Sequence, residues 1–412
     1  MTNLMTNNVY GDFIKSIREE DTPNPISTGF LLLDNVGLGS GLYNGLYVLG
    51  ATSGLGKTTF ALQIANHIAS HENRKVIYYA LEMSANELIA KSLSRIAWSL
   101  TEDHDTYNPI QNIAKKGQHG DLPLTARNIM RGHIKENFSE ENKKKLRTAM
   151  AYYNSFSENM IISSPLTKRP SVDEIVKEVT DYVQTTKNKP VVFVDYLQLL
   201  RPVEGNHGYT DKQAVTAAVN KLKLLSLSLK IPVFVISSFN RSSYSSIDVD
   251  ETAFKESGDI EYTADVVFIM ENDFNRVWIN DISSGRDLNL VDYEQEKAIE
   301  QNRDFPEKEG KQITIAEAIK NHRVTIPSAM RYVKLLPEKA IKLSILKNRF
   351  GDMLPPKMPY IPFILNAPYS VFGQTTIDGD KVKYNIDPLD DYSYEDIPIY
   401  TNPDTHEEDF EI

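Results

Sequence analysis

The sequence contains no cysteine among its 412 residues. This absence excludes disulfide bonds and cysteine-ligated metal sites, and it is typical of a reducing intracellular environment. The chain also lacks a run of about 18 apolar residues that could cross a bilayer. Its N-terminal segment has neither the basic stretch nor the apolar stretch of a secretory signal. We therefore expect a cytoplasmic protein without a membrane partner.

Basic residues are not in excess either, because the formal net charge is −11. Most of this charge belongs to residues 375–412, which hold twelve acidic residues against two lysines, Lys381 and Lys383. We expect this segment to be an acidic tail. The rest of the chain is close to neutral, which is compatible with a local basic channel for nucleic acid but does not by itself indicate one.

Apolar, β-branched segments alternate with amphipathic segments through most of the chain. The expected strands are 45–50, 75–80, 191–194, 233–237 and 266–270, and the expected helices include 58–69, 85–98, 139–155, 171–184 and 211–229. This alternation predicts an α/β fold, with a mainly parallel twisted sheet and helices on both faces. Strand patterns return at 340–346 and 360–365, after a polar, helix-prone stretch at 272–338 that we interpret as an insertion.

A glycine-rich segment, ATSGLGKT at 51–58, lies between an expected strand and an expected helix. This is the context that a phosphate-binding P-loop requires. Gly54 and Gly56 would permit a tight path, so that backbone N–H groups and the helix N-terminus face the phosphates. Lys57 would neutralise phosphate charge and Thr58 would hold Mg²⁺.

The segment departs from the usual pattern G-x-x-x-x-G-K-T at its first position. That position is Ala51, and Gly50 stands directly before it. The alternative to a P-loop is an ordinary glycine-rich turn beside a lysine, which the strand, helix and GKTT in register argue against.

Two carboxylates follow expected strands and are candidates for roles in Mg²⁺ binding and catalysis beside this loop. Asp195 ends the apolar run VVFVD and would hold Mg²⁺, and Glu82 follows the run KVIYYA and would act as the base that polarises water. Ligand sites of open α/β sheets lie at the carboxyl ends of strands, where both residues are expected. The alternatives are an aspartate that merely ends a strand and a solvent-facing glutamate before a helix.

Seven segments, taken in order, resemble the C-terminal motor domain of DnaB-type replicative helicases, phage and mobile-element relatives included. They are ISTGFLLLD (26–34), GATSGLGKTTFALQIA (50–65), ALEMS (80–84), VDYLQLL (194–200), ISSFNRS (236–242), ESGDIEYTADVVF (256–268) and LKNRFG (346–351). The resemblance implies a RecA-like P-loop NTPase core that uses ATP and Mg²⁺. It also implies single-stranded DNA as a partner and a homo-oligomeric ring, expected to be a hexamer.

The same resemblance implies roles for individual residues. Nucleotide would be bound by Ser53, Gly54, Gly56, Lys57, Thr58 and Thr59, and Mg²⁺ by Thr58 and Asp195. Glu82 would be the catalytic base, and Lys347 and Arg349 would reach the ATP site of the neighbouring subunit as a finger. Ser238, Asn240 and Arg241 match the sensor segment, and Lys255, Glu256 and Gly258 match the loop that grips the DNA backbone.

The chain also departs from the family. Ser238 stands where the family has a glutamine, and Lys255 where it has an arginine. Only about 25 residues precede the motor, so we expect no N-terminal collar domain, and residues 12–20 are a candidate linker helix. The insertion at 272–338 exceeds the usual spacing, and a partner-docking module and an added subunit contact are both open.

We expect five regions. They are an arm or linker helix at 1–25, a RecA-like ATPase core at 26–271, the insertion at 272–338, the C-terminal core strands with the finger at 339–374, and the acidic tail at 375–412. The leading hypothesis is an ATP-dependent, ring-forming replicative helicase or translocase on single-stranded DNA, with a replication partner at the insertion or the tail. The alternatives are a RecA/RadA-type recombinase and a regulatory or loader ATPase that does not unwind.

Overall fold

The computed structural model describes residues 24–100, 121–132, 134–164, 168–201, 211–238, 258–280 and 312–374. The expected linker helix, the acidic tail and most of the expected DNA-gripping loop lie outside the described residues. Within the described part, no helix has both the length and the apolar character needed to cross a membrane.

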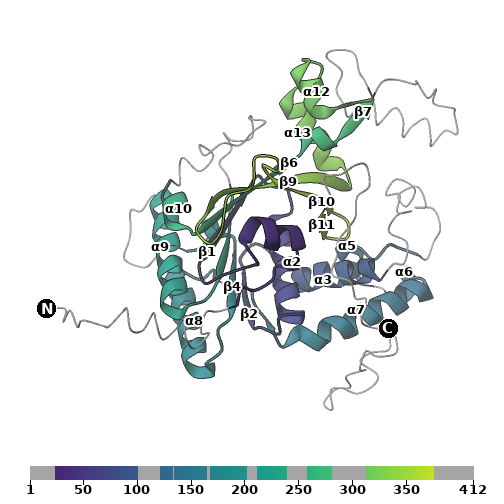
Figure 1. Cartoon of the computed structure of the whole chain (residues 1–412). Coiled ribbons are helices and arrows are strands. Elements are labelled where there is room, and N and C mark those ends of the chain that lie inside the picture. The colour runs from purple at the N-terminus through teal and green to yellow at the C-terminus, as the bar shows by residue number, and fades with distance from the viewer. Residues whose placement is uncertain are drawn as a thin grey trace.

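The described residues form one nine-stranded sheet in the order β11-β10-β9-β6-β1-β5-β4-β2-β3 (Figure 1). The strands are β1 Leu46–Ala51, β2 Val76–Ala80, β3 Met160–Ser163, β4 Val191–Asp195, β5 Val233–Ser238, β6 Val266–Asn272, β9 Glu338–Asn348, β10 Ile361–Asn366 and β11 Val371–Gln374. The strands from β6 to β3 pair in parallel, and β9, β10 and β11 add antiparallel pairs at one edge. The predicted α/β fold with a mainly parallel sheet is therefore confirmed.

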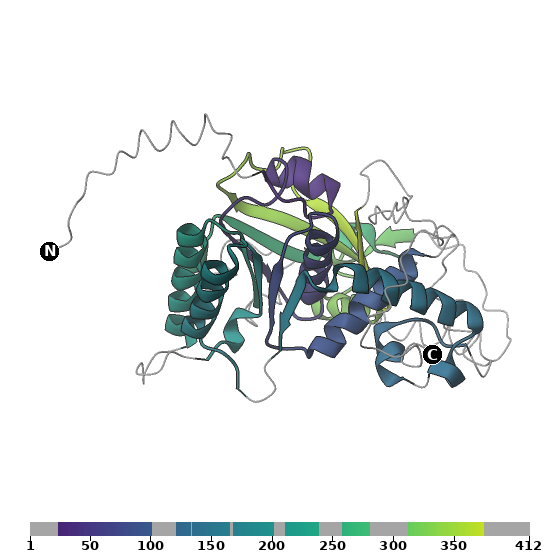
Figure 2. The ribbon, with the colours of Figure 1, turned by 90° about the horizontal axis from the view of Figure 1, so that it is seen from below.

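Helices cover both faces of this sheet (Figure 2). One face packs against α2 Lys57–Ser70, α3 Ala85–Ser99 and α7 Glu140–Ser157, and the other against α8 Val172–Thr186, α9 Asp211–Leu229 and α10 Gly258–Thr263. Shorter helices are η1 Leu33–Leu38, α5 Ala126–Arg131, α6 Ile134–Asn137 and η2 Leu197–Leu199. The central strands are buried on both faces, which explains why they are apolar at successive positions, up to the polar residues that end β4 and β5, rather than at alternate positions.

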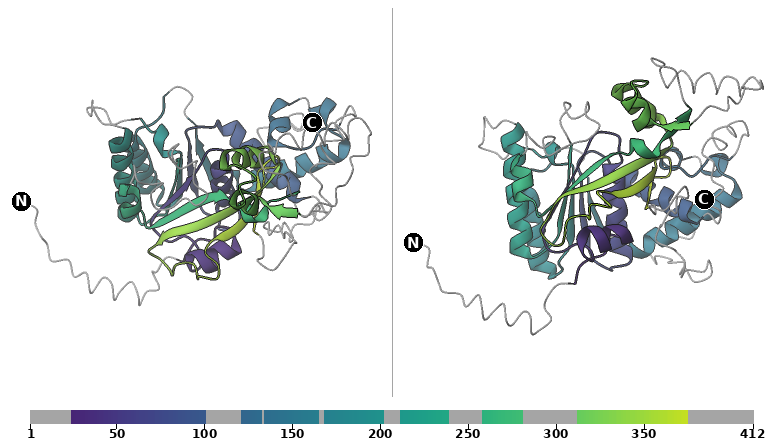
Figure 3. Two further views of the ribbon diagram at one scale, coloured as in Figure 1. Left: turned by 90° about the horizontal axis from the view of Figure 1, so that it is seen from above. Right: turned by 45° about the horizontal axis from the view of Figure 1, so that its top comes forward.

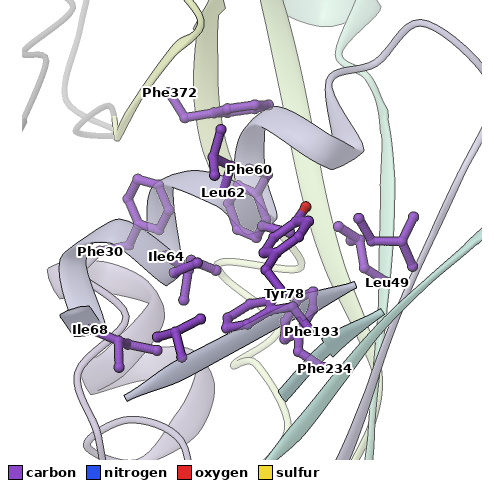
Figure 4. Packing of buried hydrophobic residues seen from close by; sticks show 14 of the residues in the cluster. Phe30, Leu49, Phe60, Leu62, Ile64, Ile68, Tyr78, Phe193, Phe234 and Phe372 are labelled. Atoms are coloured by element: carbon purple, nitrogen blue, oxygen red, sulfur yellow. The ribbon is translucent and has the colours of Figure 1, made fainter. Parts of the chain in front are cut away.

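Aromatic packing holds α2 between the sheet and its antiparallel edge. Phe60 stacks on Phe30 at 5.1 Å between ring centroids, and its edge contact with Phe372 measures 5.3 Å (Figure 4). A second edge contact of Phe60, with Phe363, measures 5.4 Å. The Gln63 side chain accepts from the Phe372 N–H and donates to its C=O, both at 2.9 Å. These contacts fix the helix that follows the glycine-rich turn, so the turn itself is held in place.

Two helices begin with capping boxes that the sequence encodes locally. Ser84 accepts from the N–H of Glu87, whose carboxylate accepts from the N–H of Ser84. Ser171 and Glu174 repeat the arrangement at the start of α8. Because such a cap sets where a helix starts, the first of them fixes the short turn that carries Glu82 between β2 and α3.

The insertion has a small hydrophobic core of its own. Its described elements are η5 Phe274–Arg276, β7 Trp278–Asn280, β8 Gln312–Thr314, α12 Ile315–Lys320 and α13 Ile326–Leu335. Its core residues are Phe274, Ile313, Ile315, Ala318, Val324, Ala329 and Val333. Figure 3 shows this module standing out from the sheet near β6 and β9. The two helices agree with the helix-prone character expected of this stretch, for which no helix bounds were predicted, and the two-stranded pair β7–β8 was not predicted.

Candidate functional site

The glycine-rich turn connects the C-terminal end of β1 to the first residue of α2. Gly54 and Gly56 have φ of 90° and 84°, a region that residues with a Cβ rarely adopt. At Gly56 a Cβ would also lie 2.7 Å from Leu365 Cδ2. Ala51, in contrast, is the last residue of β1, fully buried and without positive φ. The alanine at the first position of the pattern is therefore an ordinary strand residue, and the turn needs no glycine there.

Lys57 folds back over the turn that precedes it. Its Nζ donates to the carbonyl oxygens of Ala51 and Thr52, each at 3.0 Å. Burial lowers the pKa of this lysine, and the negative charges of Asp195 and Glu82 raise it. The ammonium thus lies at the mouth of the loop with a positive charge near two carboxylates, where it can exchange carbonyl oxygens for those of a phosphate.

Asp195 is the last residue of β4 and is almost fully buried. Its strand does not pair with β1, because β5 lies between β4 and β1 in the sheet. Its Oδ2 accepts from the Tyr78 hydroxyl at 3.0 Å, and it also accepts from the Thr58 side chain. Burial raises the pKa of Asp195 to about 6, against the lowering effect of these hydrogen bonds and of Lys57.

The second oxygen of this carboxylate, Oδ1, is buried and has no hydrogen-bond partner among the described residues. A buried carboxylate oxygen without a partner is destabilising unless a cation or a donor reaches it. Since the Thr58 side chain also donates to this carboxylate, the hydroxyl and the carboxylate lie together and offer oxygens of the hard type that Mg²⁺ prefers.

Glu82 lies in the turn after β2, two residues beyond the end of the strand at Ala80 and with an exposed side chain. Its charge raises the pKa values of Lys57, Asp195 and Tyr196, so the carboxylate faces the same edge of the sheet. The structure therefore brings Lys57, Asp195 and Glu82 together.

Ser238 ends β5, beside the glycine-rich turn, and its register partner in β1 is Ala51. The side chain of Gln198 accepts from the Ser238 N–H and donates to its C=O, both at 3.2 Å, and also donates to the Ser237 hydroxyl at 2.9 Å. The amide of Gln198 thus links the ends of β4 and β5. Asn240 and Arg241 lie outside the described residues.

Arg349 and Lys347 lie at the other end of the sheet. The Arg349 Nη1 contacts Asp265 Oδ1 at 3.3 Å, and Lys347 Nζ donates to the Tyr262 carbonyl at 3.0 Å. Asp265 also accepts from the N–H of Leu46, the first residue of β1, at 2.7 Å. At about 3.3 Å per residue, the length of β1 separates this cluster from its own glycine-rich turn by about 16 Å.

Two further lysines contact the turn and its helix. Lys91 of α3 donates to the hydroxyls of Thr59 and Ser370, at 3.2 and 3.4 Å, and Lys339 of β9 donates to the Gly54 carbonyl at 3.1 Å. No motif in the sequence pointed to either lysine, since each approaches from a segment distant along the chain. Ser53 lies in a pocket beside the insertion.

Of the expected DNA-gripping loop, the structure describes only the last residue. Gly258 is the first residue of α10, and Lys255 and Glu256 lie outside the described residues.

Comparison with known families agrees with this geometry. The model of the DnaB-like helicase C-terminal domain matches residues 25–107 and 121–315, more than half of the chain. The chain belongs to this family. The match covers the glycine-rich turn, Glu82 and Asp195 and stops before β9, which holds Lys347 and is followed by Arg349.

Two curated relatives of this DnaB-like domain are replicative DNA helicases. The chain is 28% identical over 255 residues to replicative DNA helicase DnaC of Bacillus subtilis (strain 168), covering 60% of this chain and 48% of the relative. The same identity and coverage hold for replicative DNA helicase DnaB of Geobacillus stearothermophilus. The chain thus spans about half the length of the curated relatives that it matches.

Solved structures support the fold of the DnaB-like domain. A solved ATPase domain aligns with a TM-score of 0.59 at 18% identity, covering 90% of this chain and 100% of the other. A DnaB-like replicative helicase, solved in a study of its interactions with primase, aligns with a TM-score of 0.57 at 18% identity. It covers 90% of this chain and 68% of the other. At these identities the likeness concerns the fold.

The burial of Asp195 in this DnaB-like domain predicts a measurable effect on stability. Because its pKa is raised to about 6, the folded state binds a proton more tightly than the unfolded chain does. The contribution of this group to stability is therefore full below the ordinary carboxyl pKa and is lost as pH rises through about 6. Without nucleotide at pH 7.5, we expect Asp195→Asn to raise the free energy of unfolding by about 1–2 kcal/mol.

Urea unfolding at pH 7.5 and at pH 5 measures this effect. At the lower pH the wild-type carboxyl is protonated in the folded state, so the advantage of Asp195→Asn should shrink by about 1 kcal/mol. Asp181→Asn, on an exposed position of α8, is the matched control and should change neither value. An equal gain for Asp195→Asn at both pH values would contradict the assigned cause.

Proposed function

We propose that this chain is an ATP-hydrolysing motor that moves along single-stranded DNA as a replicative helicase, with each ATP site completed by a neighbouring subunit. The observation that carries the proposal is the meeting of Lys57, Thr58, Asp195 and Glu82 at one edge of the sheet. The family and its relatives support it, since the relatives are replicative DNA helicases.

In this proposal each residue has a chemical task. The backbone N–H groups of the turn and the Lys57 ammonium bind the phosphates of ATP. Thr58 and Asp195 hold Mg²⁺, whose bound form supplies charge neutralisation at the phosphates. Glu82 orients the attacking water and accepts its proton, while the bond to the terminal phosphate breaks and ADP leaves. Its exposed position next to the charges of Lys57 and Asp195 suits this task.

The position of Arg349 supports completion of the site by a second subunit. The arginine cannot serve its own turn, because the length of β1 separates them. Half of its side chain is exposed, and Lys347 lies two residues before it, near the end of β9. A guanidinium presented in this way can stabilise the phosphate charge that develops at a neighbour's site. Closed rings repeat such an interface at every subunit.

DNA binding in this proposal rests on Lys255, Glu256 and Gly258, the segment that leads into α10. A lysine and backbone N–H groups contact phosphates rather than bases, so the binding should be independent of sequence and weaken with salt.

The proposed division of the chain follows the packing. Residues 26–271 and 339–374 share one sheet, and residues 272–338 carry the separate small core.

The proposal is tested by the ATPase rate with and without an oligonucleotide of unbiased sequence, together with the mass of the protein in ATP. We expect single-stranded DNA to stimulate hydrolysis severalfold and the mass to correspond to a closed oligomer near six subunits. Hydrolysis indifferent to DNA, in a protein that stays monomeric with ATP, would overturn the proposal in favour of a regulatory ATPase.

A further inference from the structure

The insertion returns to the sheet at the phosphate loop. It leaves from the C-terminal end of β6, which pairs in parallel with β1, so this end lies at the same edge as the turn after Ala51. The chain comes back through α13 and enters β9 at Glu338. The Asn272 amide donates to the Met330 sulfur at 3.4 Å, and Val333 packs in the core of the insertion. Helix α13 is therefore fixed beside the turn.

Lys334 is the residue of α13 that lies over the turn. A Cβ built on Gly54 would lie 3.3 Å from Lys334 Cε, and Lys339 Nζ donates to the carbonyl of the same glycine. Both lysines line a pocket whose other wall is residues 52–55 of the turn. Arg331 lines it too, and no acidic residue does among the described residues.

This arrangement gathers positive charge directly beside residues 52–55 of the glycine-rich turn. Lys339 is nearly buried and donates to backbone, so its position is set. Burial lowers the pKa of Lys339, and the positive charge of the nearby Lys334 lowers it further, because two ammonium groups at this pocket repel each other. An anion between the lysines and the turn would relieve that repulsion. Lys334 is exposed, and its flexible side chain can carry the ammonium group onto such an anion.

We propose that the insertion is part of the nucleotide site, and that Lys334 binds the phosphate chain of the nucleotide from within the same subunit. The inference rests on the proposed function, because it takes the turn after β1 to bind nucleotide. Lys334 acts by charge and does not read the base. The site would then combine one cation from the insertion of its own chain with a finger from the neighbour.

Direct binding of fluorescent mant-ATP and mant-GTP, with Mg²⁺ present, tests this role without relying on turnover. Lys334→Met keeps the aliphatic part of the side chain and removes the charge. We expect it to weaken both nucleotides equally, by about tenfold, the scale of one charge-assisted hydrogen bond. Lys334→Arg should retain most of the affinity. Lys320→Ala, an exposed lysine of α12 in the same insertion, should bind like wild type.

The outcomes separate this inference from the proposed function. If wild type binds neither nucleotide, the proposed function fails. If wild type binds and Lys57→Ala does not, but Lys334→Met binds as tightly as wild type, only the inference about the insertion fails. A loss that differs between mant-ATP and mant-GTP would also overturn it, because it would show contact with the base instead of the phosphates.

Discussion

Replacing Lys57 with alanine is expected to reduce ATP hydrolysis by at least about 10²-fold. The reason is that its ammonium is the positive group held against the turn, with Nζ 3.0 Å from the carbonyl oxygens of Ala51 and Thr52. Its loss leaves the phosphate charge without its main partner in a partly buried site. Steady-state phosphate release at saturating ATP measures the effect, with and without single-stranded DNA.

The control for this prediction is Lys189→Ala, an exposed lysine in the turn before β4, which should hydrolyse ATP like wild type. Circular dichroism and an unchanged unfolding midpoint would show that Lys57→Ala is folded. A folded Lys57→Ala protein that hydrolyses ATP at a rate within a few-fold of wild type would show that Lys57 and its turn do not take part in the hydrolysis as proposed.

Replacing Arg349 with alanine should also reduce hydrolysis, by about 10³-fold if it is a finger that reaches the neighbouring subunit. The change should leave the fold intact, because Asp265 keeps its ion pair with Lys223 and its bond from the Leu46 N–H. The decisive step is to mix the Arg349→Ala and Lys57→Ala proteins, each inactive alone. A site built from the intact turn of one and the intact arginine of the other should restore activity.

Recovery should rise with the fraction of mixed interfaces and should peak near equal amounts of the two proteins. The double variant Lys57→Ala/Arg349→Ala, mixed with Arg349→Ala, supplies no arginine and should give no recovery. A mixture of the two single variants that stays inactive, although both enter one oligomer, would place Arg349 in a role other than completing the neighbour's site.

Local patterns predicted most of the parallel sheet. The strands that become β1, β4 and β5 are apolar at successive positions until their C-terminal ends, and this pattern indicates a strand that is covered on both faces. The missed strands β3 and β11 have four residues each, too few for a reliable period. The order of the strands in the sheet could not be predicted from the sequence either. That β5 separates Asp195 from β1 follows from which strands pair, and pairing between distant segments leaves no local signature.

The residues of the candidate site likewise fall into those that a local motif predicted and those that only tertiary packing brings to the turn. Gly54, Gly56 and Lys57 lie within one short motif, so their spacing alone predicted their arrangement, and the structure shows it. Lys339 and Lys334 reach the turn from segments about 280 residues away. An isolated lysine in a polar insertion reads as a solvated surface residue, and only tertiary packing places it over Gly54.

Strand displacement from a forked duplex is the sharpest test of the proposal that this chain turns ATP hydrolysis into movement on DNA. Wild type should release the labelled strand in ATP, and Lys57→Ala should release none under the same conditions. Release should require a single-stranded tail and should not depend on its sequence. A wild-type protein that forms its oligomer and hydrolyses ATP, yet leaves the fork intact, would contradict the account and indicate a nucleotide-dependent regulator that does not unwind.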